Sequence, residues 1–443
     1  MKRILVNTSP EKSLKEWKNV FGINNQPRVG YKPRFIREKK WFGELAPRYL
    51  RHHDAPLENA GLALFDVSRI FPLFHLDEND PKNYYFADTD DFLSTLEDKS
   101  IEIDFRLGES IDHSGFGRRV APPADFEKWA RICKNIIAHY KDGANGGMHL
   151  NITRLTIWEE PDTYPELFTG SFDQYMELFA TAYRVLHEAF PDVLIGAHVF
   201  NRFNDRDGQK EYFLEGCKKY GIVPGFVALT FYSREPQDIT NVAEDYAARL
   251  KKYGFDDTEL IITEWHLGPV QWGEAGHYGD NGFDLTLSAA YSASALIRLT
   301  DIPALKAAFF YSWGTGIWSV LTQKNGKLVR RPVYYGLKFY SELMCGCTER
   351  VDVLWEEDPN VSILAGKTAD GGMKTLISCY HAEDAQFSID GTGYSSCHIR
   401  SVRDIFDEQD CLEGEDIAQL NGSSRFFFSH IGGSAVYLLE LEP

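Results

Sequence analysis

The chain has 443 residues and a globular composition, with 43% hydrophobic, 25% charged and 14% aromatic residues, long enough for a large barrel and a smaller second domain. Its formal net charge of −18 argues against nucleic acid and anionic membrane surfaces as partners and favours a neutral or cationic small molecule. No apolar stretch reaches the roughly 18 residues that a membrane span requires.

The N-terminal segment, residues 1–19, contains one short strand-like run, RILVN. It lacks the apolar core of roughly 7–15 residues that marks a secretory signal. The seven cysteines of the chain are an odd number and are scattered, which is typical of free thiols in a reducing compartment. Together these features predict a cytoplasmic protein. The sequence carries no signal for an oligomeric state.

Strand-like runs alternate with amphipathic helices over residues 20–348. The apolar pattern of the clearest helix spans Phe126 to Tyr140, and another helix begins at Ser171, whose spacing to Gln174 matches a capping box. Eight strand–helix units predict an α/β fold of the (β/α)8 TIM-barrel type. A doubly wound open sheet is the alternative, but no glycine-rich phosphate loop follows an early strand. The predicted strands cover residues 20–25, 49–54, 101–108, 151–160, 194–200, 225–233, 259–266 and 307–314.

Residues 349–443 have a different sequence pattern from residues 20–348, with short β-rich runs separated by turn residues. This pattern predicts an all-β accessory domain of the sandwich type. We expect the RILVN run near the N-terminus to add a strand to it. No low-complexity linker separates the two parts, so the barrel and the accessory domain are predicted to pack together.

Polar side chains follow the predicted barrel strands at their carboxyl ends, where barrels of this type carry their active sites. Glu160 and Glu264 stand out because each ends a strongly apolar run. Glycosidic bond cleavage needs such a pair, one carboxyl protonated and the other ionised. The alternative is two buried glutamates that are each paired with a basic residue. The strand-end residues are Asn24, Arg51, His53, Glu109, Glu159, Glu160, Asn201, Tyr232, Glu264, His266 and Trp313.

The residues around both glutamates resemble those of a known family. W-E-E-P-D, residues 158–162, resembles the W-N-E-P-D signature of glycoside hydrolase family 39, a family of retaining (β/α)8 hydrolases in clan A. I-T-E-W, residues 262–265, is similar to the nucleophile strand of that family. The similarity spans roughly residues 20–345. It includes RHHDA, FEKWARICKNIIAHY, LFTGSFDQYMELF and RPVYYGLKFYSELM.

The resemblance implies a retaining O-glycosyl hydrolase that acts by double displacement on an oligosaccharide or glycoside and is exo-acting. Glu160 would be the general acid/base and Glu264 the nucleophile, with their carboxyl groups about 5–5.5 Å apart. A metal-dependent enzyme of the same barrel class is the weaker alternative. Because the sequence has no H-x-H or H-E-x-x-H spacing, neither a metal nor another cofactor is expected.

Three positions depart from the family pattern. The asparagine before the acid/base is Glu159 here, and an ionised glutamate accepts hydrogen bonds where an amide donates them. The strand-six histidine is replaced by Thr230, while Tyr232 is kept. The glutamate after strand three is displaced by three positions, to Glu109. These departures predict a changed sugar specificity or weakened catalysis. The alternative function is therefore a catalytically impaired carbohydrate-binding relative.

Further candidates for substrate binding lie around the pair. Arg51 is expected to hold Glu264 ionised or to form a plain salt bridge inside the barrel. His53 and His266 would bind substrate or pack in the core. Trp158, Trp265 and Trp313 are candidates for the floor beneath a sugar ring, with Trp313 preferred. The loop over residues 268–284 would form the rim, with Trp272, His277, Tyr278 and Asp280.

Overall fold

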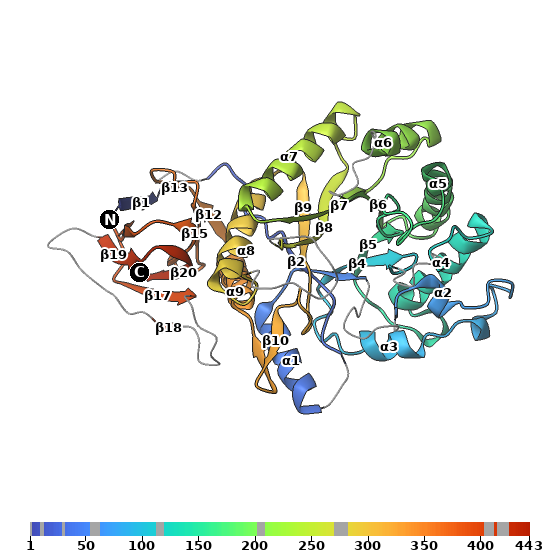
Figure 1. Cartoon of the computed structure of the whole chain (residues 1–443), viewed down its shortest axis with the longest axis horizontal. Helices are drawn as coiled ribbons and strands as arrows, with labels where there is room; N and C mark the ends of the chain where they lie inside the picture. Colours follow the sequence, from blue (N-terminus) through green and yellow to red (C-terminus); the bar gives the residue numbers. More distant parts are fainter. Residues whose placement is uncertain are drawn as a thin grey trace.

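The computed structural model describes residues 2–8, 13–28, 32–53, 63–111, 119–201, 209–269, 282–402, 412–413 and 425–443. Eight parallel strands close into a barrel in chain order, with the last strand hydrogen-bonded to the first (Figure 1). The predicted TIM barrel is confirmed, and the open doubly wound sheet is wrong. The barrel strands are β2 (Phe21–Asn24), β3 (Tyr49–His52), β4 (Glu102–Leu107), β5 (Ile152–Ile157), β6 (Leu194–Asn201), β7 (Phe226–Ser233), β8 (Glu259–Leu267) and β9 (Leu305–Phe310).

Helices surround the barrel, and local sequence fixes the ends of the two that were predicted. In α4 the Asp125 side chain accepts from the Lys128 N–H, and Gly143 ends the helix with a φ of 74°. In α5 Ser171 and Gln174 form the predicted capping box. The helices are α1 (Lys32–Leu45), α2 (Val67–Ile70), α3 (Ala87–Leu93), α4 (Phe126–Asp142), α5 (Phe172–Ala189), α6 (Gln209–Tyr220), α7 (Pro236–Lys252), α8 (Thr286–Leu299) and α9 (Pro332–Gly346), with 3-10 turns at Pro81–Asn83 and Ala144–Gly146.

Two predicted strands extend three or more residues beyond the carboxyl ends of the observed ones. The run 151–160 stops being a strand at Ile157, because Trp158 and Glu160 adopt positive φ values of 67° and 34°. The run 307–314 is a strand only to Phe310. In both places the apolar pattern continues beyond the strand into a turn, and these turns carry several of the candidate site residues.

The strands outside the barrel form a hairpin, which follows the last barrel strand in the chain, and two sheets that lie to one side of the barrel (Figure 1). β1, from the N-terminus, pairs in parallel with β16 and antiparallel with β13, and the core between the two sheets includes Ile4, Phe387 and Leu439. The strands are β1 (Lys2–Thr8), β10 (Leu321–Lys324), β11 (Lys327–Arg330), β12 (Glu349–Val351), β13 (Val353–Leu354), β14 (Val361–Lys367), β15 (Met373–Ala382), β16 (Ala385–Asp390), β17 (Ser396–Val402), β18 (Leu412–Glu413), β19 (Arg425–His430) and β20 (Gly433–Glu442).

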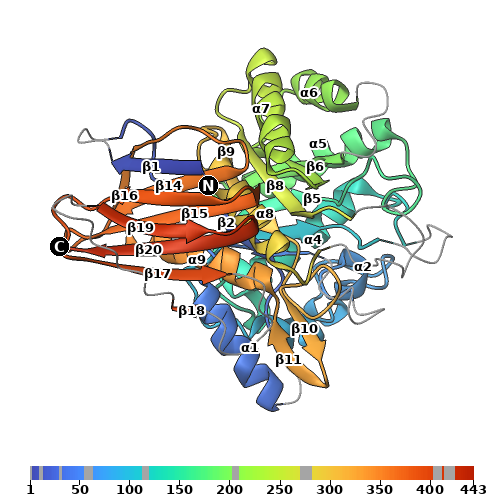
Figure 2. The ribbon, with the colours of Figure 1, turned by 60° about the vertical axis from the view of Figure 1, so that its left-hand side comes forward.

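The six-stranded sheet of the β region packs on α8 and α9 of the barrel (Figure 2). The Ser378 hydroxyl donates to the carbonyl oxygen of Ala290 at 2.8 Å, and the Tyr380 hydroxyl donates to that of Arg234. The two helices approach closely at Gly336, where a Cβ atom would lie 2.5 Å from the Ala289 carbonyl oxygen. The six-stranded sheet therefore packs against the outer helices of the barrel.

Two general features complete the fold. Six of the seven cysteines lie in the described residues, and all six are free thiols. Within those residues, no helix combines the length and apolarity that crossing a membrane requires.

Candidate active site

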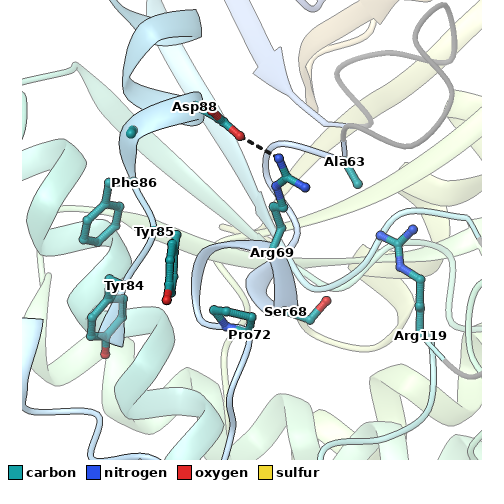
Figure 3. A pocket seen from close by; sticks show the side chains of 10 residues that line it. Ala63, Ser68, Arg69, Pro72, Tyr84, Tyr85, Phe86, Asp88 and Arg119 are labelled. Carbon is teal, nitrogen blue, oxygen red and sulfur yellow. Dashed lines mark hydrogen bonds and ion pairs between the residues drawn. The ribbon is translucent and has the colours of Figure 1, made fainter. Parts of the chain in front are cut away.

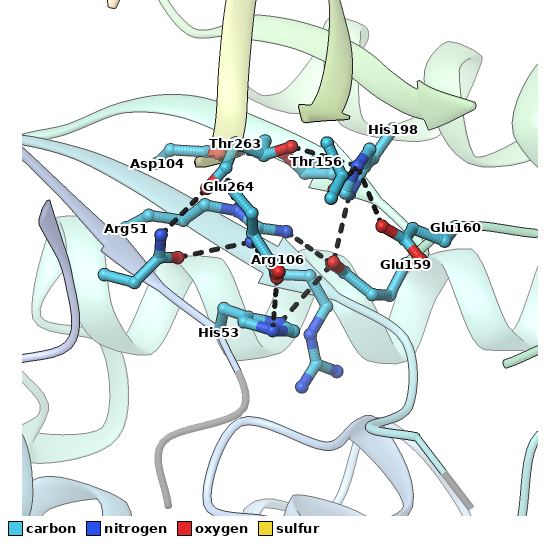
Figure 4. A network of polar contacts seen from close by, with 12 residues as sticks. Arg51, His53, Asp104, Arg106, Thr156, Glu159, Glu160, His198, Thr263 and Glu264 are labelled. Carbon is cyan, nitrogen blue, oxygen red and sulfur yellow. Dashed lines mark hydrogen bonds and ion pairs between the residues drawn. The ribbon is translucent and has the colours of Figure 1, made fainter. Parts of the chain in front are cut away.

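Three glutamates converge at the carboxyl end of the barrel (Figure 4). Glu159 and Glu160 lie in the turn after β5, and Glu264 lies on β8. Trp158 anchors that turn, because its N–H donates to the Leu107 carbonyl oxygen at 2.6 Å and its buried indole donates to that of Leu167 at 2.8 Å. Trp158 is thus structural. The turn directs both adjacent glutamates inward, leaving Glu159 2% and Glu160 8% exposed.

Arg51, on β3, is completely buried beneath these carboxylates. Its guanidinium forms a close ion pair with Glu159 and lies 3.5 Å from Glu264 Oε1 and 3.5 Å from Asp104 Oδ2. It also donates to Asn24 Oδ1 at 3.3 Å, and the Asn24 amide in turn donates to the Thr263 carbonyl oxygen at 2.8 Å. Arg51 therefore contacts Glu264, as expected, but its closest partner is Glu159.

Both carboxylate oxygens of Glu264 have further partners. His53 Nε2 lies 2.9 Å from Oε1, and the Tyr232 hydroxyl donates to Oε2 at 2.9 Å. His53 Nδ1 lies 3.4 Å from Glu159 Oε2, so one imidazole bridges the two glutamates. The structure thus brings together six predicted site residues: Arg51, His53, Glu159, Glu160, Tyr232 and Glu264.

The three glutamates differ in their affinity for protons. Burial, reinforced by the charge of Glu159, raises the pKa of Glu264 to about 7. Burial also raises the pKa of Glu160, against the opposing charge of His198. For Glu159, burial acts in the same direction, but the neighbouring charges of Arg51, His53 and His198 hold its pKa well below the usual range. Glu159 is therefore the glutamate held in its ionised form, whereas burial favours the protonated forms of Glu160 and Glu264.

His198, on β6, is a site residue that was not among the strand-end candidates. Its buried ring lies between the adjacent glutamates, with Nδ1 3.0 Å from Glu159 Oε1 and Nε2 3.6 Å from Glu160 Oε1 (Figure 4). Its position near the carboxyl end of the predicted fifth strand was the available signal.

Two predicted substrate-binding residues are buried against aromatic rings. His266 is buried among Phe283, Phe310 and Trp318, and burial lowers its pKa to about 3, so it is a neutral core histidine. The indole of Trp313 is buried edge-on against Phe42, with ring centroids 5.0 Å apart.

Two other aromatic rings lie beside residues that contact Glu264. Tyr311 lies 6.2 Å from the His53 ring, and the half-buried Trp318 lies 5.4 Å from the Tyr232 ring. Both were missed, because the turn after β9 does not continue the strand alternation. Most of the expected rim, including Trp272, His277, Tyr278 and Asp280, lies outside the described residues, as does the side chain of Asn201.

Glu109 belongs to a separate network. It accepts hydrogen bonds from the Ser68 N–H and hydroxyl, and burial, with the charge of Asp66, raises its pKa to about 8. Arg106 points away from the glutamate cluster (Figure 4) and donates to Asp66 at 3.0 Å. Asp66 also accepts from Ser110 and pairs with Arg119.

A cavity of about 700 Å³ lies beside this second network (Figure 3). Its wall carries Arg119, the Arg69–Asp88 ion pair at 2.6 Å, and Tyr85, whose side chain is 62% exposed. Nearby, the Val67 N–H donates to the Gly108 carbonyl oxygen just after β4. The cavity is therefore at the carboxyl end of the barrel, but none of the three central glutamates is among its described lining residues.

Within the described residues, two groups of side chains have the composition of a metal site. These are His53, Glu159 and Glu264, and Glu159, Glu160 and His198, with ligand atoms within 4.8 Å of one another in each group. The Arg51 guanidinium already supplies a positive charge between Glu159 and Glu264. Because a divalent cation would face that charge directly, the arrangement fits an arginine-neutralised carboxylate cluster better than a metal centre.

Solved structures with the same fold include several glycoside hydrolases. A glucosidase from Croceicoccus marinus matches with a TM-score of 0.78 at 20% identity, over 100% of this chain and 99% of that one. A GH39 β-xylosidase from Caulobacter crescentus matches with a TM-score of 0.69 at 16% identity, over 99% of this chain and 100% of that one. An α-L-arabinofuranosidase from Thermotoga maritima matches with 0.67 at 10%, over 100% of both chains. The comparisons thus confirm the expected fold, a (β/α)8 barrel with an accessory β domain. No protein-family model and no curated protein matches the sequence.

Proposed function

We propose that the chain is a retaining glycoside hydrolase in which Glu264 is the nucleophile and Glu160 the general acid/base. The observation that carries this proposal is the pair itself. Both carboxyl groups lie at the carboxyl end of the barrel, each within 4.8 Å of a Glu159 oxygen, in separate surroundings. Glu264 has Arg51, His53 and Tyr232 as partners, and Glu160 has His198.

These surroundings suit a double displacement. The ionised Glu264 attacks the anomeric carbon while Glu160 donates its proton to the departing glycosidic oxygen. The bond to the leaving group breaks and a glycosyl ester forms on Glu264. Glu160, now ionised, takes a proton from water, whose oxygen attacks the same carbon and releases Glu264. Arg51 and Tyr232 stabilise the Glu264 carboxylate before attack and after release.

We further propose exo action on an oligosaccharide or simple glycoside. The two reacting carboxyl groups are almost fully buried, a geometry that suits the end of a glycan better than its middle. The related folds include a glucosidase, a β-xylosidase and an α-L-arabinofuranosidase, so aryl glycosides of these sugars form the first panel. The odd cysteine count supports a cytoplasmic location as part of this proposal.

The test compares the parent with Glu160→Ala and Glu264→Ala on aryl glycosides that the parent hydrolyses. Each variant should lose at least about 100-fold in kcat, and the first product should keep the anomeric configuration of the substrate. Glu109→Gln is the matched control, a buried carboxyl bonded to Ser68, and should change turnover by less than about threefold. Near-parental turnover in either alanine variant would refute the assigned roles.

A carbohydrate-binding protein with impaired catalysis is the second candidate. Glu159 favours it, because this residue replaces the expected amide donor and its oxygens already contact Arg51, His53 and His198. Saturable binding of a monosaccharide without turnover of any aryl glycoside would support this candidate over the first.

A further inference from the structure

The ring of His198 faces hydrogen-bond acceptors on both sides. Its Nδ1 lies 3.0 Å from a carboxylate oxygen of Glu159. Its Nε2 lies 2.8 Å from the hydroxyl oxygen of Thr230 and 3.0 Å from that of Thr263. The protonation of this buried ring therefore depends on where the two hydroxyl protons point.

Both hydroxyl protons have acceptors elsewhere. The Thr263 hydroxyl donates to the Leu229 carbonyl oxygen at 3.0 Å, and a carbonyl oxygen can only accept. The Thr230 hydroxyl forms a hydrogen bond with the Glu160 carboxyl. Each threonine oxygen is thus left to offer a lone pair to Nε2, and Glu159 offers one to Nδ1. A ring with acceptors at both nitrogens is satisfied when both carry protons, which makes it an imidazolium.

The charges around the ring favour the same state. The charged and titratable groups that face it are Glu159 and Glu160 from the turn after β5, Glu264 from β8 and Arg51 from β3. Burial lowers the pKa of His198, but the negative charges of Glu159 and Glu160 outweigh burial and the repulsion of Arg51, so the pKa is raised overall.

We propose that His198 is a positioning residue, a buried imidazolium sustained by Glu159 that holds Glu160 in place as the proton donor. This inference rests on the proposed function. It also accounts for two departures from the family pattern together. A glutamate in place of an amide puts an extra anion beside Glu160, and His198 neutralises that anion. Where threonine replaces the strand-six histidine, His198 on the neighbouring strand contacts that threonine, Thr230.

The charged ring matters at the moment of proton transfer. When Glu160 gives up its proton it becomes an anion in a buried site that already contains Glu159 and Glu264. His198 Nε2, 3.6 Å from Glu160 Oε1, offsets that repulsion and lowers the cost of releasing the proton. The benefit is large for a leaving group that needs the proton and small for one that departs without it.

The first test needs no substrate. Side-chain ¹⁵N spectra report the protonation of each of the 13 histidines, and the signal lost in His198→Asn assigns this ring. At pH 7 the parent should show both His198 nitrogens protonated, and Glu159→Gln should show one of them deprotonated. A neutral His198 in the parent at pH 7 would overturn the proposal. A charged His198 in a parent that turns over no glycoside would count against the proposed function and leave the ion pair supported.

The second test separates positioning from a merely structural role. On glycosides with a poor leaving group, such as methyl or phenyl, His198→Asn should lose about 100-fold in kcat/KM, and with dinitrophenyl less than about threefold. Equal losses on both substrates would overturn the proposal. Glu159→Gln should likewise lose more kcat/KM on the poor leaving groups than on dinitrophenyl. It replaces His198→Asn in this test if that variant does not fold. His139→Asn is the matched control, because His139 is also buried and lies 3.1 Å from a carboxylate, that of Asp90.

Discussion

Replacing Glu264 with glutamine should stabilise the protein, and the gain should grow with pH. In the unfolded chain Glu264 ionises with the ordinary glutamate pKa near 4.5, whereas burial and Glu159 raise its pKa to about 7 in the folded protein. A group with a raised folded pKa contributes stability that is fully present below the unfolded pKa and is lost as pH rises through the folded pKa. The parent should therefore weaken between pH 4.5 and 7, and Glu264→Gln should lack that loss.

The size of the effect follows from the interval between the two pKa values. Each pH unit in it costs about 1.4 kcal/mol, so the gain of the variant over the parent should be about 3 kcal/mol larger at pH 8 than at pH 4.5. Urea unfolding of both proteins across this range measures it. Glu244→Gln, at an exposed position on α7, controls for the loss of one charge. A gain that does not change with pH would show that folding does not raise the pKa of Glu264.

Three further changes test the same cluster. Arg51→Met should lower the free energy of unfolding by about 3–5 kcal/mol at pH 8, because it leaves Glu159, Glu264 and Asp104 without their shared cation. Urea unfolding measures this loss, and a loss below about 1 kcal/mol would contradict the prediction. The kcat/KM of the parent should rise as pH increases through about 7, because Glu264 cannot attack while it is protonated. A kcat/KM profile already flat from pH 5 upward would be inconsistent with the raised pKa of Glu264. Dialysis against a chelator should leave turnover unchanged, because Arg51 already supplies positive charge to the carboxylates. If activity were lost on chelation and recovered when a divalent metal is added, the metal-dependent alternative would be favoured.

Much of the fold could be predicted because the apolar patterns are long and regular. The eight barrel strands overlap the predicted runs, and the capping box at Ser171 is present in the structure. The position of a residue after an apolar run was enough to select Glu160, Glu264 and Arg51, since parallel strands bring their carboxyl ends to one rim.

The errors have a common physical origin. Side-chain direction depends on whether the strand stays regular, and apolar spacing does not reveal where it becomes irregular. The β7–β8 register shifts by one residue between Leu229 and Thr230, and the β6–β7 register shifts after His198. Such bulges redirect side chains next to active sites. They limit what strand alternation predicts for His198 and for His266, which lies in an aromatic cluster.

In the proposed mechanism Glu264 forms a covalent glycosyl ester, which can be trapped and identified. The direct measurement uses a 2,4-dinitrophenyl 2-deoxy-2-fluoroglycoside of the sugar that the parent hydrolyses best, followed by mass spectrometry of the intact chain and its peptides. A double displacement through Glu264 predicts one added glycosyl group per chain, located on Glu264, and none in Glu264→Gln. A label on Glu160, or continued turnover with no label on any residue, would contradict it.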